Sequence, residues 1–138
     1  MRVIIAGSRT FGSRRADVMA AINAADSLGS ARITEVISGC APGVDTIGEE
    51  WAVDHGIYIR RFPADWDTHG KAAGPIRNRQ MAANADALIL VWDGSSRGSA
   101  DMKCAALDAG LLVVEAILGP QAVNLNAWSE LRAKARAR

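Results

Sequence analysis

The sequence has few cysteines, few aromatic residues, no long apolar run and almost no net charge. Its 138 residues include 2 cysteines, 4 tryptophans, 1 tyrosine and 2 phenylalanines, and the formal net charge is +1. Two cysteines without a CxxC spacing cannot form a disulfide framework, so the reducing cytoplasm is the expected location. No apolar run approaches the ~20 residues of a membrane span, and the apolar start is too short for a secretory signal. The near-zero charge argues against a dedicated nucleic-acid binder, which usually carries a basic excess.

Short apolar runs alternate with glycine-bearing loops and helical segments along the chain. With 49% hydrophobic residues, a chain of this length can bury the core of one domain and is not disordered. The apolar runs occupy residues 3–6, 33–37, 57–59, 87–91 and 111–114. Several of them are nearly continuous, which is typical of parallel strands covered on both faces. We therefore predict an α/β fold, a three-layer sandwich with a mostly parallel five-stranded sheet.

The segments between these runs have the period of helices. The predicted inward faces hold Val18, Ile22, Ala25 and Leu28 in the first helix and Val44, Ile47, Gly48, Trp51 and His55 in the second. Gly48 lets the second helix approach the sheet closely. Pro75 suits the first turn of a third helix. Ser99 can cap a fourth helix, which Gly110 ends.

The chain changes character after the fifth apolar run, at Gly119-Pro120. We predict a domain over residues 1–118, followed over residues 119–138 by a C-terminal helix and a basic tail. The basic side chains of this end are Arg132, Lys134, Arg136 and Arg138. Cations are favourable at a helix C-terminus, and a tail that binds nucleic acid or a partner is the alternative reading.

Ligands of open parallel sheets bind beyond the carboxyl ends of the strands, so the loops at 7–13, 38–45 and 92–99 are the candidate site. All three are rich in glycine or serine and lead into a helix. Such turns offer free backbone N–H groups and the positive end of a helix dipole, which suit a phosphate. The Walker pattern and GxGxxG are both absent. A glycine in one such turn can serve only the strand-to-helix geometry, but three converging loops favour a pocket for an anion.

Charged and aromatic side chains accompany these loops. Arg77 and Arg79 lie about 200° apart on a helix, so they cannot both point inward, and we favour Arg77, near the helix start. Asp45, in the turn before the second helix, is a candidate partner for a ribose hydroxyl. Trp66 and Trp92 flank the loops and could stack on a base, although each could equally be a core residue. We predict no metal site, because the two histidines and two cysteines lack metal-ligand spacing.

Five ordered motifs resemble those of a known family. They are Gly-Ser-Arg-Thr-Phe at 7–11, Ser-Gly-Cys-Ala-Pro-Gly-Val-Asp at 38–45, Pro-Ala-Asp-Trp at 63–66, Gly-Pro-Ile-Arg-Asn at 74–78 and Trp-Asp-Gly-Ser-Ser-Arg-Gly at 92–98. Together they resemble the YspA/YpsA-like branch of the SLOG superfamily over roughly residues 1–118. The resemblance implies a Rossmann-like domain that binds a nucleotide or nucleotide-derived ligand. It also implies kinship with the cytokinin-activating phosphoribohydrolases and with the DNA-processing protein A domain.

The phosphoribohydrolase pattern is matched only in part. Arg77 and Met81 match its first motif, but the loop at 92–99 is longer than PGGxGT, and Met102 stands where those enzymes have the catalytic Glu. Methionine cannot transfer a proton. The catalytic candidates are therefore Asp45, Asp101 and Arg77, with Asp93 as a further carboxylate, and whether the protein is an enzyme stays open.

Three functional hypotheses follow. The first is a SLOG-type domain that binds a nucleotide-derived small molecule, without a cofactor. The second is an enzyme that cleaves the N-glycosidic bond of a nucleoside monophosphate, and the third is a non-catalytic module that binds protein or DNA. A homodimer is expected by analogy with the related enzymes. The predicted ligand-binding residues are Gly7, Ser8, Arg9, Thr10, Phe11, Gly39, Gly43, Asp45, Trp66, Arg77, Asn78, Trp92, Asp93, Gly94, Ser95, Arg97, Gly98 and Ser99.

Overall fold

A parallel sheet forms the middle layer of the protein. The computed structural model describes residues 1–29 and 31–119. Within them, the strands are β1 (Arg2–Gly7), β2 (Glu35–Ser38), β3 (Tyr58–Arg61), β4 (Ala87–Trp92) and β5 (Leu112–Ile117). They pair in the order β3-β2-β1-β4-β5, and every pairing is parallel. The predicted strands are confirmed, and the sheet is parallel throughout.

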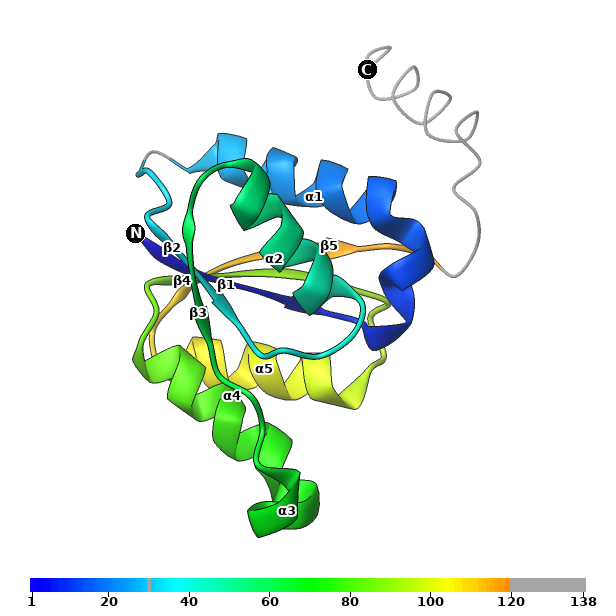
Figure 1. The fold of residues 1–138 in the computed structure, drawn as a ribbon, viewed down its shortest axis with the longest axis vertical. Coiled ribbons are helices and arrows are strands. Elements are labelled where there is room, and N and C mark those ends of the chain that lie inside the picture. Colours follow the sequence, from blue (N-terminus) through cyan, green and yellow to red (C-terminus); the bar gives the residue numbers. More distant parts are fainter. Residues whose placement is uncertain (30, 120–138) are drawn as a thin grey trace, which may run out of the picture.

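Helices cover both faces of this sheet, which confirms the predicted three-layer sandwich (Figure 1). One outer layer holds the 3-10 helix η1 (Arg9–Arg14), α1 (Arg15–Leu28) and α2 (Val44–Asp54). The other holds α4 (Ala73–Ala83) and α5 (Arg97–Asp108). The short α3 (Trp66–His69) and the 3-10 helix η2 (Gly70–Ala72) precede α4. In Figure 1, α3 projects from the body of the domain beyond the start of α4.

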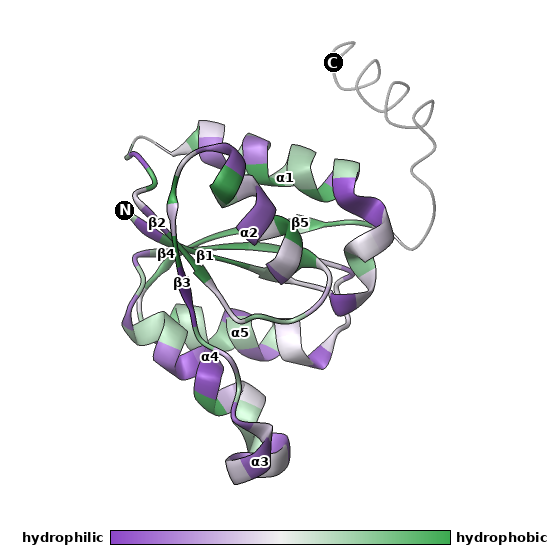
Figure 2. Cartoon of the chain, in the orientation of Figure 1, coloured by the Kyte–Doolittle hydropathy of each residue, from purple (hydrophilic) through white to green (hydrophobic). Residues whose placement is uncertain are grey.

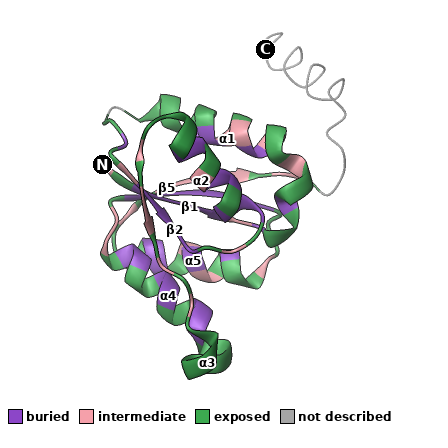
Figure 3. Ribbon diagram, in the orientation of Figure 1, coloured by how far each residue is buried: buried purple, intermediate pink, exposed green. Residues whose placement is uncertain are grey.

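The alternating side chains of the strands build two apolar layers, one on each face of the sheet. Val3 and Ile5 of β1 pack with α1 and α2, whereas Ile4 and Ala6 pack with α4 and α5. The central strands β1 and β4 are strongly apolar (Figure 2) and buried (Figure 3), whereas the edge strand β3 is largely hydrophilic. Gly48 of α2 lies against Ile5 as predicted, since a Cβ there would be 2.7 Å from Ile5 Cγ2.

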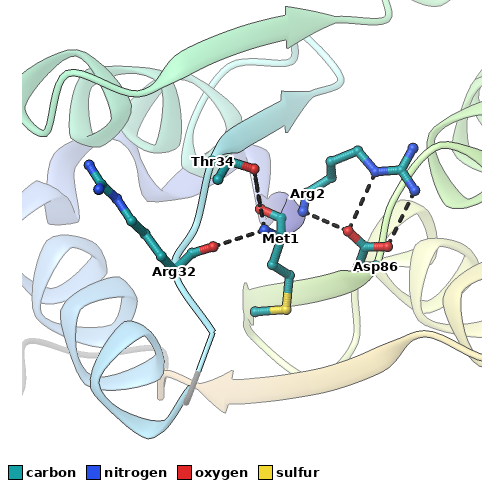
Figure 4. A network of polar contacts seen from close by, with 5 residues as sticks. All are labelled: Met1, Arg2, Arg32, Thr34 and Asp86. Carbon is teal, nitrogen blue, oxygen red and sulfur yellow. Dashed lines mark hydrogen bonds and ion pairs between the residues drawn. The ribbon is translucent and has the colours of Figure 1, made fainter.

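Polar contacts tie the strands together at their amino ends (Figure 4). The backbone nitrogen of Met1 donates to the Arg32 carbonyl at 2.8 Å and to Thr34 Oγ1 at 3.2 Å. The backbone N–H of Arg2 donates to Asp86 Oδ2 at 2.8 Å, and its guanidinium pairs with the same carboxylate. These donors lower the pKa of Asp86. The network fixes the amino ends of the strands, at the end of the sheet opposite the candidate site.

Three predictions of local structure need correction. His55, predicted on the inward face of the second helix, is exposed at the C-cap of α2. The N-cap of α5 is Ser96 rather than Ser99, because the Ser96 side chain accepts from the Ser99 backbone N–H. Leu28 is 76% exposed, because it is the last residue of α1, where the helix ends. No helix within residues 1–29 and 31–119 is long and apolar enough to cross a membrane. The predicted C-terminal helix and basic tail lie outside the described residues.

Candidate ligand-binding site

Ser8 joins three loops at the carboxyl ends of the strands. Its backbone N–H donates to the Val91 carbonyl at 3.2 Å, and its carbonyl accepts from the N–H of Val44 at 3.3 Å. The Ser8 hydroxyl accepts from the N–H of Asp93 at 3.1 Å. Ser8 is buried, so these bonds satisfy its polar groups and hold the ends of β1 and β4 against the start of α2.

Two of the predicted glycines are required by this close approach of backbones. A Cβ on Gly7 would lie 1.7 Å from the Val91 carbonyl oxygen. Gly43 has φ +79°, and a Cβ there would lie 2.4 Å from the Ser8 carbonyl oxygen. Both positions exclude any side chain. The close approach of the backbones explains the glycine at position 43 without a ligand, since Gly43 lines neither of the cavities described next.

A cavity of about 240 Å³ opens where these loops meet. The predicted residues that line it come from all three loops and from α4: Gly7, Ser8, Arg9, Thr10, Asp45, Arg77, Asn78, Asp93, Gly98 and Ser99. The other lining residues were not predicted to bind the ligand: Ala6, Ala41, Met81, Ser96 and Met102. Met81 and Met102 were named only through the resemblance to the phosphoribohydrolase pattern. Ser96 could have been found as the residue before the helical pattern of α5, whereas Ala6 and Ala41 carry no chemical signal in the sequence.

A buried carboxylate and a buried guanidinium stand side by side in this cavity. Asp45 and Arg77 are only 5% and 8% exposed. Asp45 Oδ2 accepts from the N–H of Ala41 at 3.2 Å, while Arg77 donates to the Gly39 carbonyl and to Asn78 Oδ1. A Cβ on Gly39 would lie 2.7 Å from Arg77 Nη1 and 2.9 Å from Asp45 Oδ2. Gly39 therefore lets both charged groups approach the same point of the backbone.

Burial changes the proton affinity of both groups. It raises the pKa of Asp45 to about 6, against the opposing effects of the Ala41 N–H and of the Arg77 and Arg9 charges. Burial likewise lowers the pKa of Arg77, which stays charged at neutral pH. The cavity thus holds a carboxyl group that exchanges protons near neutral pH beside a permanent positive charge, and such groups are concentrated at functional sites.

Arg79 points away from the cavity, as the helical spacing from Arg77 predicts. Its guanidinium pairs with Asp101 at 3.0 Å, and Asn78 Nδ2 donates to the same carboxylate at 2.9 Å. Burial alone would raise the pKa of Asp101, but the hydrogen bonds from Arg79 and Asn78 outweigh it and lower the pKa. Asp101 does not line the cavity, so this catalytic candidate is an outer support for Asn78.

The first turn of α5 forms the opposite wall. The Asp93 carboxylate accepts from the N–H groups of Ser95 and Ser96 at 2.9 Å, which lowers its pKa. Ser96 Oγ then accepts from the Ser99 N–H at 3.3 Å. The N–H groups of Arg97 and Gly98, the first two residues of α5, have no carbonyl partner within that helix. Gly98 lines the cavity, so this end of α5 offers a donor and a positive dipole end.

A smaller cavity of about 160 Å³ adjoins the first. The two share Arg9, Ala41 and Arg77. The smaller one is also lined by Gly39, Cys40, Pro42, Pro63, Ala64 and Trp66. The Arg9 guanidinium lies over the Trp66 ring, 5.7 Å from its centroid. Gly39 and Trp66 are the predicted residues found here rather than in the larger cavity.

The remaining predicted residues line neither cavity. Phe11 and Trp92 are buried in the two apolar layers of the core, because Trp92 ends β4 with its ring on the face covered by α5. Gly94, Ser95 and Arg97 are exposed on the loop before α5 and at its first residue. Of the two candidate tryptophans, Trp66 is therefore the one at a cavity.

Comparison with known proteins identifies the family. The family model of the YspA, cpYpsA-related SLOG family matches residues 1–69. The Gene 61 protein of Mycobacterium phage D29 is 34% identical over 120 residues, which span 82% of this chain and 94% of the phage protein. The chain belongs to this SLOG family. Met102, which the sequence pattern predicts at the position of a phosphoribohydrolase Glu, lines the larger cavity of this SLOG domain.

A solved structure supports the fold. The chain superposes on DNA processing protein A (DprA) from Streptococcus pneumoniae with a TM-score of 0.65, covering 89% of this chain at 19% identity. The chain spans about half of the DprA chain (51%). The likeness shows that both contain a SLOG-type Rossmann-like fold.

Proposed function

We propose that this SLOG domain binds a nucleotide or a nucleotide-derived small molecule in the larger cavity. The observation that carries the proposal is the convergence of Asp45, Arg77 and the first turn of α5 on one cavity at the carboxyl ends of β1 and β4. These strands lie at the centre of the strand order, next to the point where the chain crosses from one face of the sheet to the other. Open α/β sheets bind ligands at this place.

The anionic part of the ligand is assigned to the wall made by α5. The N–H of Gly98 and the dipole of α5 attract a phosphate group, and Arg9 and Arg77 supply positive charge from the other side. Arg9 is exposed and forms no ion pair within residues 1–29 and 31–119. Its guanidinium is therefore available to a phosphate without the loss of an ion pair, and the contact that it would give up is the cation–π contact with Trp66.

Asp45 is assigned to a ribose hydroxyl. A carboxylate accepts hydrogen bonds from hydroxyl groups, and Asp45 is held by the Ala41 N–H at 3.2 Å. Because Arg77 lies beside it, a sugar that carries a phosphate can meet both groups at once. A ligand with a hydroxyl-bearing sugar and a phosphate therefore fits this site better than a simple anion.

The test is a panel of thermal unfolding measurements with nucleoside phosphates, ADP-ribose, NAD and cyclic nucleotides at millimolar concentration. A ligand at 100 times its Kd stabilises the fold by about 2.7 kcal/mol, which raises the Tm by several degrees. We expect the Arg9→Ala variant to lose most of the shift. Arg32→Ala is the matched control, since Arg32 is exposed near the amino ends of the strands, at the other end of the sheet from the cavity. If no compound raises the Tm, the proposal is wrong.

Cleavage of an N-glycosidic bond is the second candidate function, and the pKa of Asp45 favours it. A general acid works best with a pKa near the working pH, and the Asp45 pKa is raised to about 6. Incubation with AMP, followed by chromatography for free adenine, tests this function. We expect Asp45→Asn to abolish any release, and release that survives this substitution would exclude Asp45 as the acid.

A further inference from the structure

The two cavities are each too small for a whole nucleotide-sized ligand. They measure about 240 and 160 Å³, whereas pockets for drug-sized ligands start at about 300 Å³. They adjoin at Arg9, Ala41 and Arg77. A ligand of ordinary size must therefore extend from one cavity into the other, past the two arginines.

The smaller cavity has the walls that a planar ring requires. Pro42, Pro63, Ala64 and Trp66 provide flat or apolar surface, and none of the described residues that line it is a carboxylate. Burial raises the pKa of Cys40, so this lining thiol is neutral. The charged groups at this cavity are Arg9 and Arg77, which stand at the boundary with the larger cavity. Among the described residues, the carboxylates Asp45 and Asp93 therefore line only the larger cavity, whereas the aromatic ring of Trp66 lines only the smaller one.

The Trp66 ring is held in place as a platform. Trp66 is the first residue of α3, and the preceding Asp65 caps this turn by accepting from the Thr68 N–H at 3.1 Å. A Cβ on Gly74, at the start of α4, would lie 3.4 Å from the far edge of the indole, so the ring rests against the α4 backbone. The ring is nevertheless 48% exposed, which leaves aromatic surface for a ligand.

Arg9 lies over this aromatic surface. Its guanidinium is 5.7 Å from the centroid of the Trp66 ring, and a cation–π contact at an exposed site is weak. A phosphate in the larger cavity offers the same guanidinium a stronger, charge-assisted partner. Movement of Arg9 to the phosphate would then uncover the Trp66 ring.

We propose that the smaller cavity is a second subsite of the same ligand site, in which Trp66 stacks on the planar base of a nucleoside phosphate. This inference rests on the proposed function and adds its direction: the phosphate lies toward α5 and the base toward α3. The subsite makes the domain selective for ligands that carry an aromatic base over phosphosugars that lack one.

The test compares AMP with ribose 5-phosphate, which share the phosphate and the sugar and differ by the base. Binding is measured by titration calorimetry and by chemical-shift perturbation with the full chain. Stacking of one base on an aromatic side chain corresponds to about 5- to 150-fold in affinity. We expect AMP to bind more tightly than ribose 5-phosphate by a factor in this range.

The Trp66 variants locate the source of that preference. Trp66→Ala should weaken AMP to the level of ribose 5-phosphate while the affinity for ribose 5-phosphate is unchanged, and Trp66→Phe should keep most of the preference. Tyr58→Ala is the matched control, because Tyr58 is an exposed aromatic residue that lines neither cavity. It should leave both affinities unchanged.

The outcomes separate this inference from the function on which it rests. Equal binding of AMP and ribose 5-phosphate to the unaltered chain would overturn the base subsite and leave the proposed function standing. An equal loss of both ligands in Trp66→Ala would also overturn it, since Trp66 would then contact the shared part. No binding of either ligand, with no Tm shift in the wider panel, would overturn both proposals.

Discussion

The charge state of Asp45 should control part of the pH dependence of stability, and Asp45→Asn is the perturbation that reveals it. Asparagine has nearly the shape of the neutral carboxyl group and keeps an oxygen that can accept from the Ala41 N–H. It cannot ionise. The variant therefore differs from the unaltered chain chiefly where Asp45 is charged.

The magnitude follows from the pKa of the buried group. Burial raises the pKa of Asp45 from its ordinary 3.8 to about 6, and each unit corresponds to about 1.36 kcal/mol. The folded state binds this proton more tightly than the unfolded state, so the contribution is fully present below about pH 4 and is lost as the pH rises through about 6. Ionised Asp45 therefore costs on the order of 3 kcal/mol at and above neutral pH.

The assay is urea unfolding, followed by circular dichroism, of both chains from about pH 4 to about pH 8. Other carboxylates have lowered pKa values, among them Asp86, Asp93 and Asp101. They make stability rise with pH in both chains and cancel in the difference. We expect the free energy of unfolding of Asp45→Asn to gain about 3 kcal/mol on that of the unaltered chain across this range.

The informative quantity is how the difference in the free energy of unfolding between the two chains changes with pH, because this change is independent of any constant effect of the substitution. A change in packing, for example, shifts the variant by a similar amount at every pH. The attraction between Asp45 and Arg77 exists only while Asp45 is ionised, and it is already included in the pKa of Asp45. If the difference between the two chains changes by less than about 1 kcal/mol over the range, Asp45 is not a desolvated carboxyl group. The acid role considered for it would then lose its basis.

Two further substitutions test the local geometry that holds the site. Gly7→Ala should lower the free energy of unfolding by about 3 kcal/mol or more, because the added Cβ would lie 1.7 Å from the Val91 carbonyl oxygen. The control is Gly12→Ala, whose added Cβ meets nothing within 4 Å and which should be nearly neutral. Equal Tm values for the two variants would contradict this prediction. Ser96→Ala should cost about 0.5–2 kcal/mol by removing the cap of α5, measured by thermal unfolding against the exposed control Ser13→Ala. A loss no larger than that of the control would mean that the Ser96 hydroxyl does not cap the helix.

The order of strands and helices and the position of the larger cavity were predictable from local patterns. Apolar runs such as Ala87–Val91 mark buried parallel strands, and the angular spacing on α4 correctly turns Arg77 inward and Arg79 outward. These properties depend on residues close together in the chain. The rule that ligands bind at the carboxyl ends of parallel strands then points to the loops that line this cavity, without any knowledge of their contacts.

The lining of the cavities depends on contacts between segments far apart in the chain, and the same patterns could not supply it. Ser8 and Asp93 are 85 positions apart, and their hydrogen bond holds the loop before α5 against the end of β1. Gly98 then lines the cavity, whereas its neighbour Arg97 does not. In the sequence, Trp66 and Trp92 both flank the loops at the carboxyl ends of strands. Only the tertiary packing of α5 buries Trp92 and leaves Trp66 at a cavity. The proton affinity of Asp45 likewise arises only when α2, α4 and the end of β1 exclude water from its carboxyl group.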